Sequence, residues 1–102
     1  MNVKFMEWDC EVQFAHYSNG RTGIRLIDQV DGEPIATATV NLPNEPLGEG
    51  EVIVKDYSEN AGMLKALMDA GIVSAPSRYV SSGFITAPVC ILLYEPSTET
   101  KH

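Results

Sequence analysis

The residues that could support nucleophilic catalysis are few and widely spaced. The chain has two histidines and two cysteines, and His102 stands in a polar C-terminal tail, which leaves His16 as the plausible imidazole base. A cysteine–histidine pair would require His16 to meet Cys10 or Cys90 in space. Cys10 precedes His16 on the same predicted strand, at a separation of roughly 20 Å. We therefore predict that the chain is not an enzyme. An enzyme that uses His16 with a cysteine is the third hypothesis, ranked after the two non-enzymatic functions described below.

The acidic residues and glycines do not form a metal or nucleotide pattern. The acids of residues 28–33 lack the spacing of a calcium loop, and a hairpin turn explains the pair Asp31-Gly32. Gly48 and Gly50 resemble two glycines of a dinucleotide fingerprint, but they precede a predicted strand instead of following one. The two cysteines form no CxxC motif. We expect no metal and no cofactor.

The acidic charge of the chain is concentrated in one segment. Residues 28–59 hold eight acidic side chains and one lysine, which accounts for the whole net charge of −7. Such a surface repels nucleic acid and anionic membranes, whereas a basic protein or a cation complements it. The simpler alternative is a solvated surface that serves solubility. We predict a basic protein partner, such as one that itself binds nucleic acid. The predicted partner-binding residues are Asp31, Glu33, Glu45, Glu49, Glu51, Asp56, Glu59 and Asn60.

The densest polar run of the chain, residues 55–60, lies where a predicted strand leads into a predicted helix. Ser58 or Asn60 is expected to cap the helix, and Asp56 and Glu59 would complement its dipole. Sites often occur at such junctions. The alternative function is therefore a small-ligand-binding or regulatory module with its site at residues 55–60.

The elements that position these residues begin with three predicted strands. Apolar and polar residues alternate at period two over residues 9–17, 21–28 and about 33–41, which indicates strands with one buried face. Turn residues separate them at Ser18-Asn19-Gly20 and at Val30-Asp31-Gly32. We therefore predict an antiparallel meander.

The register of the meander follows from its turns. A three-residue loop ending in a left-handed glycine pairs Phe14 with Ile24, and the next such loop pairs Leu26 with Ala36. Two-residue loops would set Phe14 beside Arg25, and a one-residue slip exchanges the two faces. The first register places these residues on one buried face: Cys10, Val12, Phe14, Ile24, Leu26, Ala36, Ala38 and Val40.

A second group of elements follows a loop rich in proline and glycine. The β-branched run at 51–57 predicts a strand, and a helix is expected at about 59–70 with Gly71 as its stop signal. The apolar stripe of this helix is Ala61, Leu64, Leu67, Met68 and Ile72. The small residues Ala36 and Ala38 leave room for the helix on one face of the sheet.

Two further strands are predicted at 79–86 and 89–94, with Pro88 indicating an edge or a bulge between them. The fold class is thus α+β: an antiparallel β-meander with further strands and one α-helix packed on one face. Residues 1–95 form a single predicted domain, and residues 96–102 a polar, disordered tail.

Length and composition bound the class of protein. The chain has 102 residues, of which 44% are hydrophobic, as expected of one globular domain. The N-terminus has no signal-peptide pattern, and no apolar run approaches the roughly 20 residues of a membrane span. We therefore predict a cytoplasmic protein with reduced thiols. A homo-oligomer through an outer apolar spot at Ile27 and Ile35, or through an exposed edge strand, is left open.

Two stretches of the chain carry a resemblance. They are Gly-Glu-Pro-Ile-Ala-Thr-Ala-Thr-Val-Asn-Leu-Pro, residues 32–43, and Val-Lys-Asp-Tyr-Ser-Glu-Asn-Ala-Gly-Met, residues 54–63. Over residues 10–93 the chain resembles small uncharacterised proteins of bacterial phages and conjugative elements. The resemblance implies a mobile-element context and the cytoplasm of a bacterial host, but no catalytic assignment. By analogy, it suggests an anti-defence protein, for example of the anti-CRISPR kind, that occupies a basic nucleic-acid site.

Overall fold

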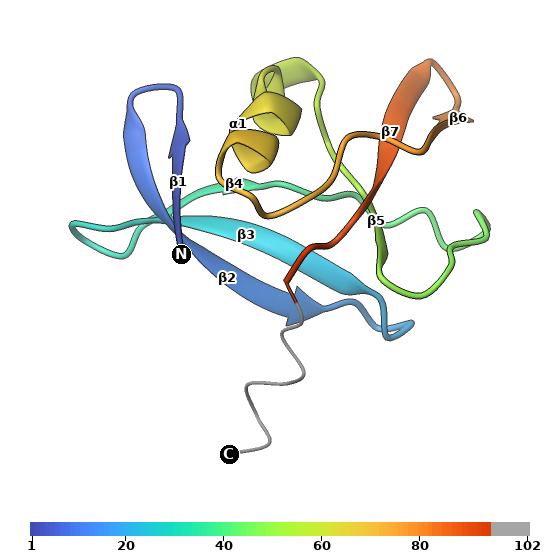
Figure 1. Ribbon diagram of the computed structural model, residues 1–102, viewed down its shortest axis with the longest axis horizontal. Helices are drawn as coiled ribbons and strands as arrows, with labels where there is room; N and C mark the ends of the chain where they lie inside the picture. Colours follow the sequence, from blue (N-terminus) through green and yellow to red (C-terminus); the bar gives the residue numbers. More distant parts are fainter. Residues whose placement is uncertain (95–102) are drawn as a thin grey trace.

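The computed structural model describes residues 1–94, and the predicted tail at 96–102 lies outside this part. Two antiparallel sheets and one helical segment make up the fold, which confirms the α+β class (Figure 1). Neither helical element of the described residues has the length and apolar composition that crossing a bilayer would take.

The first sheet has the order β1-β2-β3-β4, from β1 (Asn2–Phe5), β2 (Trp8–His16), β3 (Thr22–Asp28) and β4 (Pro34–Thr37). The predicted register is confirmed, because Phe14 lies opposite Ile24 and Leu26 lies opposite Ala36. The first predicted loop, Ser18-Asn19-Gly20, is also confirmed, because Tyr17 N–H donates to the carbonyl of Arg21. The second predicted loop is wrong, because Asp28 N–H donates to the carbonyl of Glu33 and the loop therefore spans residues 29–32. A bulge in β4 restores the predicted pairing of Leu26 with Ala36.

A bulge alters the end of this meander. The pairing shifts between Leu26 and Ile27, so that Ile27 lies opposite Pro34 and Ile35 is the extra residue. Ile35 packs against the buried core. The predicted outer apolar spot is therefore wrong at Ile35, because the bulge turns this side chain inward.

Strand β1 was not predicted from the sequence. It pairs with β2 through a tight turn at Met6 and Glu7, where Met6 has a φ of 54°. Val3 and Phe5 are almost fully buried. A four-residue strand that ends in a turn without glycine or proline gives little sequence signal.

The second sheet has the order β5-β7-β6, from β5 (Glu51–Ile53), β6 (Arg78–Ser82) and β7 (Ile85–Ile91). The predicted boundary at Pro88 is wrong, because β7 runs through this residue and the turn lies at Gly83 and Phe84. Pro88 is tolerated in a central strand because the β5–β7 pairing ends one residue earlier, at Ile53 and Val89. The missing N–H of Pro88 therefore costs a single backbone hydrogen bond, at the end of the β5–β7 ladder.

The chain passes from one sheet to the other at residues 38–40. Ala38 N–H donates to Ile24 of β3, and Val40 N–H donates to Ile53 of β5. Thr39 lies between them, bridged to Val54. The two sheets are thus joined directly through the backbone.

The predicted helical segment is present in two parts. A 3-10 turn at Ser58–Asn60 precedes the helix α1 (Met63–Asp69). At its end Gly71 has a φ of 75°, its N–H donates to Met68, and Ile72 N–H donates to Leu67. These bonds form a Schellman motif and confirm the predicted stop at Gly71.

The buried residues form two clusters. The main cluster lies between α1 and the sheets and comprises Val3, Phe5, Cys10, Ile24, Leu26, Ala38, Val52, Val54, Met63, Leu67, Ile72, Val73 and Cys90. The smaller cluster, under the loop that precedes β5, comprises Ile53, Val80, Ala87 and Val89. From the helix, Met63 and Leu67 are fully buried, whereas Ala61 and Met68 of the predicted stripe are exposed.

Candidate protein-binding surface

The acidic segment of residues 28–59 does not form one continuous surface. It consists of the acidic hairpin tip (residues 28–33), the arginine-held loop (residues 42–51) and the helix junction (residues 55–60). In Figure 1 the turn between β3 and β4 and the loop before β5 project from opposite ends of the molecule. The predicted residues are therefore divided among surfaces with different properties.

In the acidic hairpin tip, carboxylates shape the turn that carries them. Asp28 Oδ1 accepts from Val30 N–H at 2.8 Å, and Asp31 Oδ1 accepts from Glu33 N–H at 3.0 Å. Gly32, with a φ of 75°, ends the turn, and its N–H donates to the carbonyl of Asp28. Val30 lies between these carboxylates with 92% of its surface exposed. Each aspartate uses one oxygen on the turn, and its other oxygen accepts no hydrogen bond within residues 1–94.

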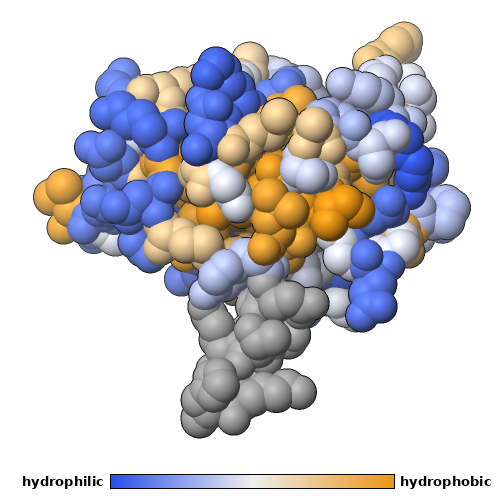
Figure 2. All heavy atoms as spheres, viewed as in Figure 1, coloured by the Kyte–Doolittle hydropathy of each residue, from blue (hydrophilic) through white to orange (hydrophobic). Residues whose placement is uncertain are grey.

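The hairpin formed by β1 and β2 adds negative charge beside the acidic hairpin tip. Gln29 N–H donates to the Asp9 carbonyl, and Asp28 lies opposite Cys10 in the ladder. Burial raises the pKa of the Cys10 thiol, and the charges of Asp28 and Asp9 raise it further. The pair between Lys4 and Asp9, 3.4 Å apart, is exposed and weak. In the space-filling view, hydrophilic surface surrounds an apolar spot at this end (Figure 2).

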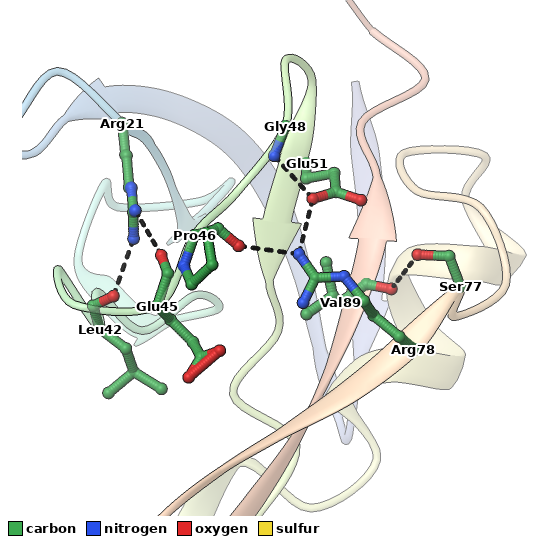
Figure 3. Close-up of polar contacts among 9 residues, drawn as sticks. All are labelled: Arg21, Leu42, Glu45, Pro46, Gly48, Glu51, Ser77, Arg78 and Val89. Atoms are coloured by element: carbon green, nitrogen blue, oxygen red, sulfur yellow. Dashed lines mark hydrogen bonds and ion pairs between the residues drawn. The ribbon is translucent and has the colours of Figure 1, made fainter.

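Two arginines from outside the acidic segment hold the loop at residues 42–51 (Figure 3). Arg21, next to the β2–β3 turn, donates to the carbonyls of Leu42 and Glu45. Arg78 of β6 donates to the carbonyl of Pro46 and to Glu51 Oε1, each at 2.9 Å. The charge of this loop is therefore partly neutralised by residues distant in the sequence.

The glutamates of the arginine-held loop differ in their contacts. Glu51 accepts from Gly48 N–H at 2.8 Å, and this bond, followed by Arg78, holds the pKa of its carboxyl below the ordinary value. The Glu45 carboxylate points away from both arginines in Figure 3. Within residues 1–94, neither Glu45 nor Glu49 has a side-chain hydrogen bond or ion pair. Glu51 thus serves the loop, whereas Glu45 and Glu49 face solvent.

At the helix junction, the polar side chains mainly bind one another and the backbone. Asp56 Oδ1 accepts from the N–H groups of Gly62 and Leu64, at 3.1 and 2.9 Å, and thereby caps α1. Lys55 and Glu59 form an ion pair at 2.7 Å that raises the pKa of Lys55 and lowers that of Glu59. Capping by Ser58 or Asn60 is therefore a wrong prediction, because the 3-10 turn places α1 beyond both residues.

Asn60 is buried and belongs to none of these surfaces. It is 1% exposed, and its amide donates to the carbonyl of Thr37 at 2.7 Å. A polar side chain of this kind can be buried because a backbone group satisfies it. Asn60 therefore connects the helix junction to β4 and is inaccessible to a partner.

The thiols and the imidazole lie in different environments. Cys10 and Cys90 are fully buried in the main cluster, whereas His16 is exposed at the end of β2. Burial, followed by the charge of Asp56, raises the pKa of Cys90 to about 11. A thiol in this state is a poor nucleophile near neutral pH. Among the residues that the structure describes, no three histidine, cysteine or acidic side chains are grouped to hold a metal ion.

Comparison with known proteins gives no relative: no family model, no curated protein and no solved structure matches the chain. The site is therefore assigned from its geometry. Asp31 and Glu33 lie together at the acidic hairpin tip, and Asp9 and Val30 are additions that the sequence argument missed. An isolated valine between two acids in a predicted turn was the available signal for Val30.

Proposed function

We propose that this chain is a non-enzymatic protein-binding module whose acidic hairpin tip docks on a basic partner protein. The observation that carries the proposal is the 92% exposure of Val30 among the carboxylates of Asp28, Asp31 and Glu33. Binding energy in protein interfaces concentrates in a few apolar anchors surrounded by a polar rim. An acidic rim adds attraction for a basic partner and speeds association.

The partner that suits this tip is a protein whose own ligand is nucleic acid. Basic residues gathered to bind phosphates would find the carboxylates of the tip complementary, and free nucleic acid would be repelled. We propose that the chain blocks such a site, as an anti-defence protein encoded by a mobile element would. The sequence resemblance motivates this context, and the carboxylates of the acidic hairpin tip supply the charge complementarity.

The alternative, a small-ligand module at the helix junction, is less well supported. Asp56 caps α1, Lys55 and Glu59 pair with each other, and Asn60 is buried. These groups would have to leave their present partners to bind a ligand. A thermal-shift screen against nucleotides and metals tests this alternative, since a ligand of the native state raises the unfolding midpoint.

A pull-down from bacterial lysate at low and high salt tests the proposal. The tip variant combines Asp31→Asn with Glu33→Gln, and the amide that replaces the Asp31 carboxylate retains an oxygen for the turn. The matched control combines Glu45→Gln with Glu49→Gln, which removes the same charge at the opposite end. We expect a salt-sensitive partner that the wild type and the control retain and that the tip variant and Val30→Ser lose.

The same experiment can contradict the proposal in two ways. The absence of any salt-sensitive partner would count against binding through charge. A partner lost equally from the tip variant and from the control would show a response to net charge rather than to the acidic hairpin tip. Addition of duplex DNA or RNA should displace the partner if its basic site is the one occupied.

A further inference from the structure

The outer strand β6 has one edge without a partner in residues 1–94, because it pairs only with β7. Val54 N–H donates to the carbonyl of Pro88, so Pro88 directs its backbone groups toward β5. Tyr79 lies opposite Pro88, and residues opposite one another in an antiparallel ladder exchange both bonds or neither. The N–H and C=O of Tyr79, and those of Ser81 two residues on, therefore point to the open edge.

This edge lacks the devices that protect exposed strands. Natural edges carry lysines, prolines, bulges or inward charges that prevent pairing with another chain. The sequence of β6 is Arg-Tyr-Val-Ser-Ser, and its one charged residue, Arg78, is engaged with Pro46 and Glu51. By contrast, the edge strand β1 carries Lys4, whose side chain is 64% exposed. An unprotected edge of this kind is available for pairing with another strand.

We propose that β6 of a second copy of this chain covers the edge, antiparallel and centred on Val80. This register sets Tyr79 opposite Ser81 of the second copy at two equivalent places, which gives four backbone hydrogen bonds in an isologous contact. It sets Arg78 opposite Ser82 of the second copy and opposes no like charges. The outcome is one continuous six-stranded sheet built from two three-stranded sheets.

Apolar side chains on the same hairpin support this contact. Tyr79 is 62% exposed, Phe84 in the β6–β7 turn is fully exposed, and Ile85 is 37% exposed. In the proposed register Phe84 extends past Ser82 toward residues 75–77 of the second copy, where an alanine and a proline offer apolar surface. These contacts add the burial that a short strand pair needs.

The charge distribution also permits the contact. The acidic hairpin tip lies at the far end of the molecule from β6, so two copies paired at β6 keep their tips apart (Figure 1). In the arginine-held loop, Glu51 is paired with Arg78 of the same copy, and Glu45 lines a hollow with Ser81 and Ser82. Because Ser82 is set opposite Arg78 of the second copy, the contact brings a basic residue rather than a second acid to the strand end beside Glu45.

Sedimentation equilibrium of the full chain over a wide concentration range tests the proposal. We expect a mass twice the 11.1 kDa of one chain at high concentration, falling to one chain on dilution. Ser81→Lys should raise the dissociation constant at least about tenfold by placing like charges at the contact. Thr86→Lys is the matched control, because Thr86 lies opposite Ser81 but on the inner strand β7. It should leave the dimer intact.

A second variant acts on the backbone alone. Ser81→Pro removes an N–H that the β6–β7 ladder does not use, so the fold should survive while pairing is lost. Amide exchange of the wild type adds a direct reading, since the amides of Tyr79 and Ser81 should become protected as concentration rises. Lys4 on the edge strand β1 should show no such change.

Three outcomes would overturn the proposal. These are a monomer at every concentration, a dimer that survives both Ser81 variants, and a dimer that Thr86→Lys disrupts equally. Protection of Tyr79 and Ser81 only after a foreign protein is added would identify that protein, not a second copy, as the occupant. Because no partner is present in sedimentation, failure here is distinct from failure of the acidic hairpin tip.

Discussion

The acidic hairpin tip and the arginine-held loop are both rich in acidic residues, but they have opposite roles. Both contain glycine turns, yet within residues 1–94 the aspartates of the tip form hydrogen bonds only with backbone groups of the tip itself. In the loop, Arg21 and Arg78 bind three carbonyls and one carboxylate. The comparison shows that a run of acids is a candidate recognition surface only where no distant cation reaches it. Four substitution experiments can break or sharpen this contrast.

The largest effect is expected at Arg78, because its guanidinium makes charge-assisted bonds to Pro46 and Glu51. Replacement by methionine should lower the free energy of unfolding by about 2 kcal/mol. The matched control is Arg25→Met, which removes an exposed arginine and should change stability by less than about 0.5 kcal/mol. Urea denaturation measures both. Equal stability of the two variants would mean that Arg78 does not hold the loop.

The next effect concerns an acid used inside the fold. Asp56→Ala removes the cap from α1 and should cost about 1 kcal/mol, whereas Asp56→Asn retains an acceptor and should cost less. Thermal unfolding of the two variants is the measurement. A loss as large for asparagine as for alanine would indicate that charge, rather than the hydrogen bonds, matters at this position.

A smaller effect should appear as a pH dependence at Glu51. Its pKa is lowered in the folded chain, so its contribution to stability is present above the unfolded pKa and is lost as the pH falls through the folded value. The pH range in which this contribution is lost therefore lies below about pH 4.3, the ordinary pKa of a glutamate. Glu51→Gln should flatten the stability curve there, and the tip variant serves as the comparison. Parallel curves for wild type and Glu51→Gln would contradict the assigned cause.

The smallest effect is expected at the tip itself. Val30→Ser and the double change Asp31→Asn with Glu33→Gln should each alter stability by less than about 0.5 kcal/mol, because these side chains are exposed. Chemical denaturation alongside the Arg78 variant measures this. A tip whose substitution destabilised the chain as much as loss of Arg78 would be a structural element, and the contrast between the two regions would fail.

The sequence predicted features that depend on near neighbours in the chain. The register of β2 and β3 followed from a glycine turn and one apolar face, and the end of α1 followed from Gly71. The pairing of Leu26 with Ala36 followed from the apolar face, although the turn between β3 and β4 is one residue longer than predicted. Strand β1 was missed because its turn at Met6 uses a residue that rarely adopts positive φ.

Features that depend on distant pairings were not predictable in the same way. The boundary at Pro88 failed because the end of β5 decides which N–H groups of β7 are needed. The partial neutralisation of the arginine-held loop could not be predicted, because the arginines that bind it, Arg21 and Arg78, lie about 20 to 30 residues away in the sequence. Asn60 was predicted to lie on the surface, and its bond to Thr37 is another contact between distant segments. Charge counted along a segment cannot register such contacts.

The passage of residues 38–40 between the sheets has a consequence for the order of folding. The first sheet joins neighbouring segments through short turns, whereas β5 must meet β7 across about forty residues, a slow loop closure. Because Val40 bonds directly to Ile53, a completed first sheet would hold β5 ready to receive β7. We therefore expect amides of β2 and β3 to gain protection earlier than those of β5 and β7 in pulse-labelled refolding. Simultaneous protection would mean that the two sheets condense in a single step.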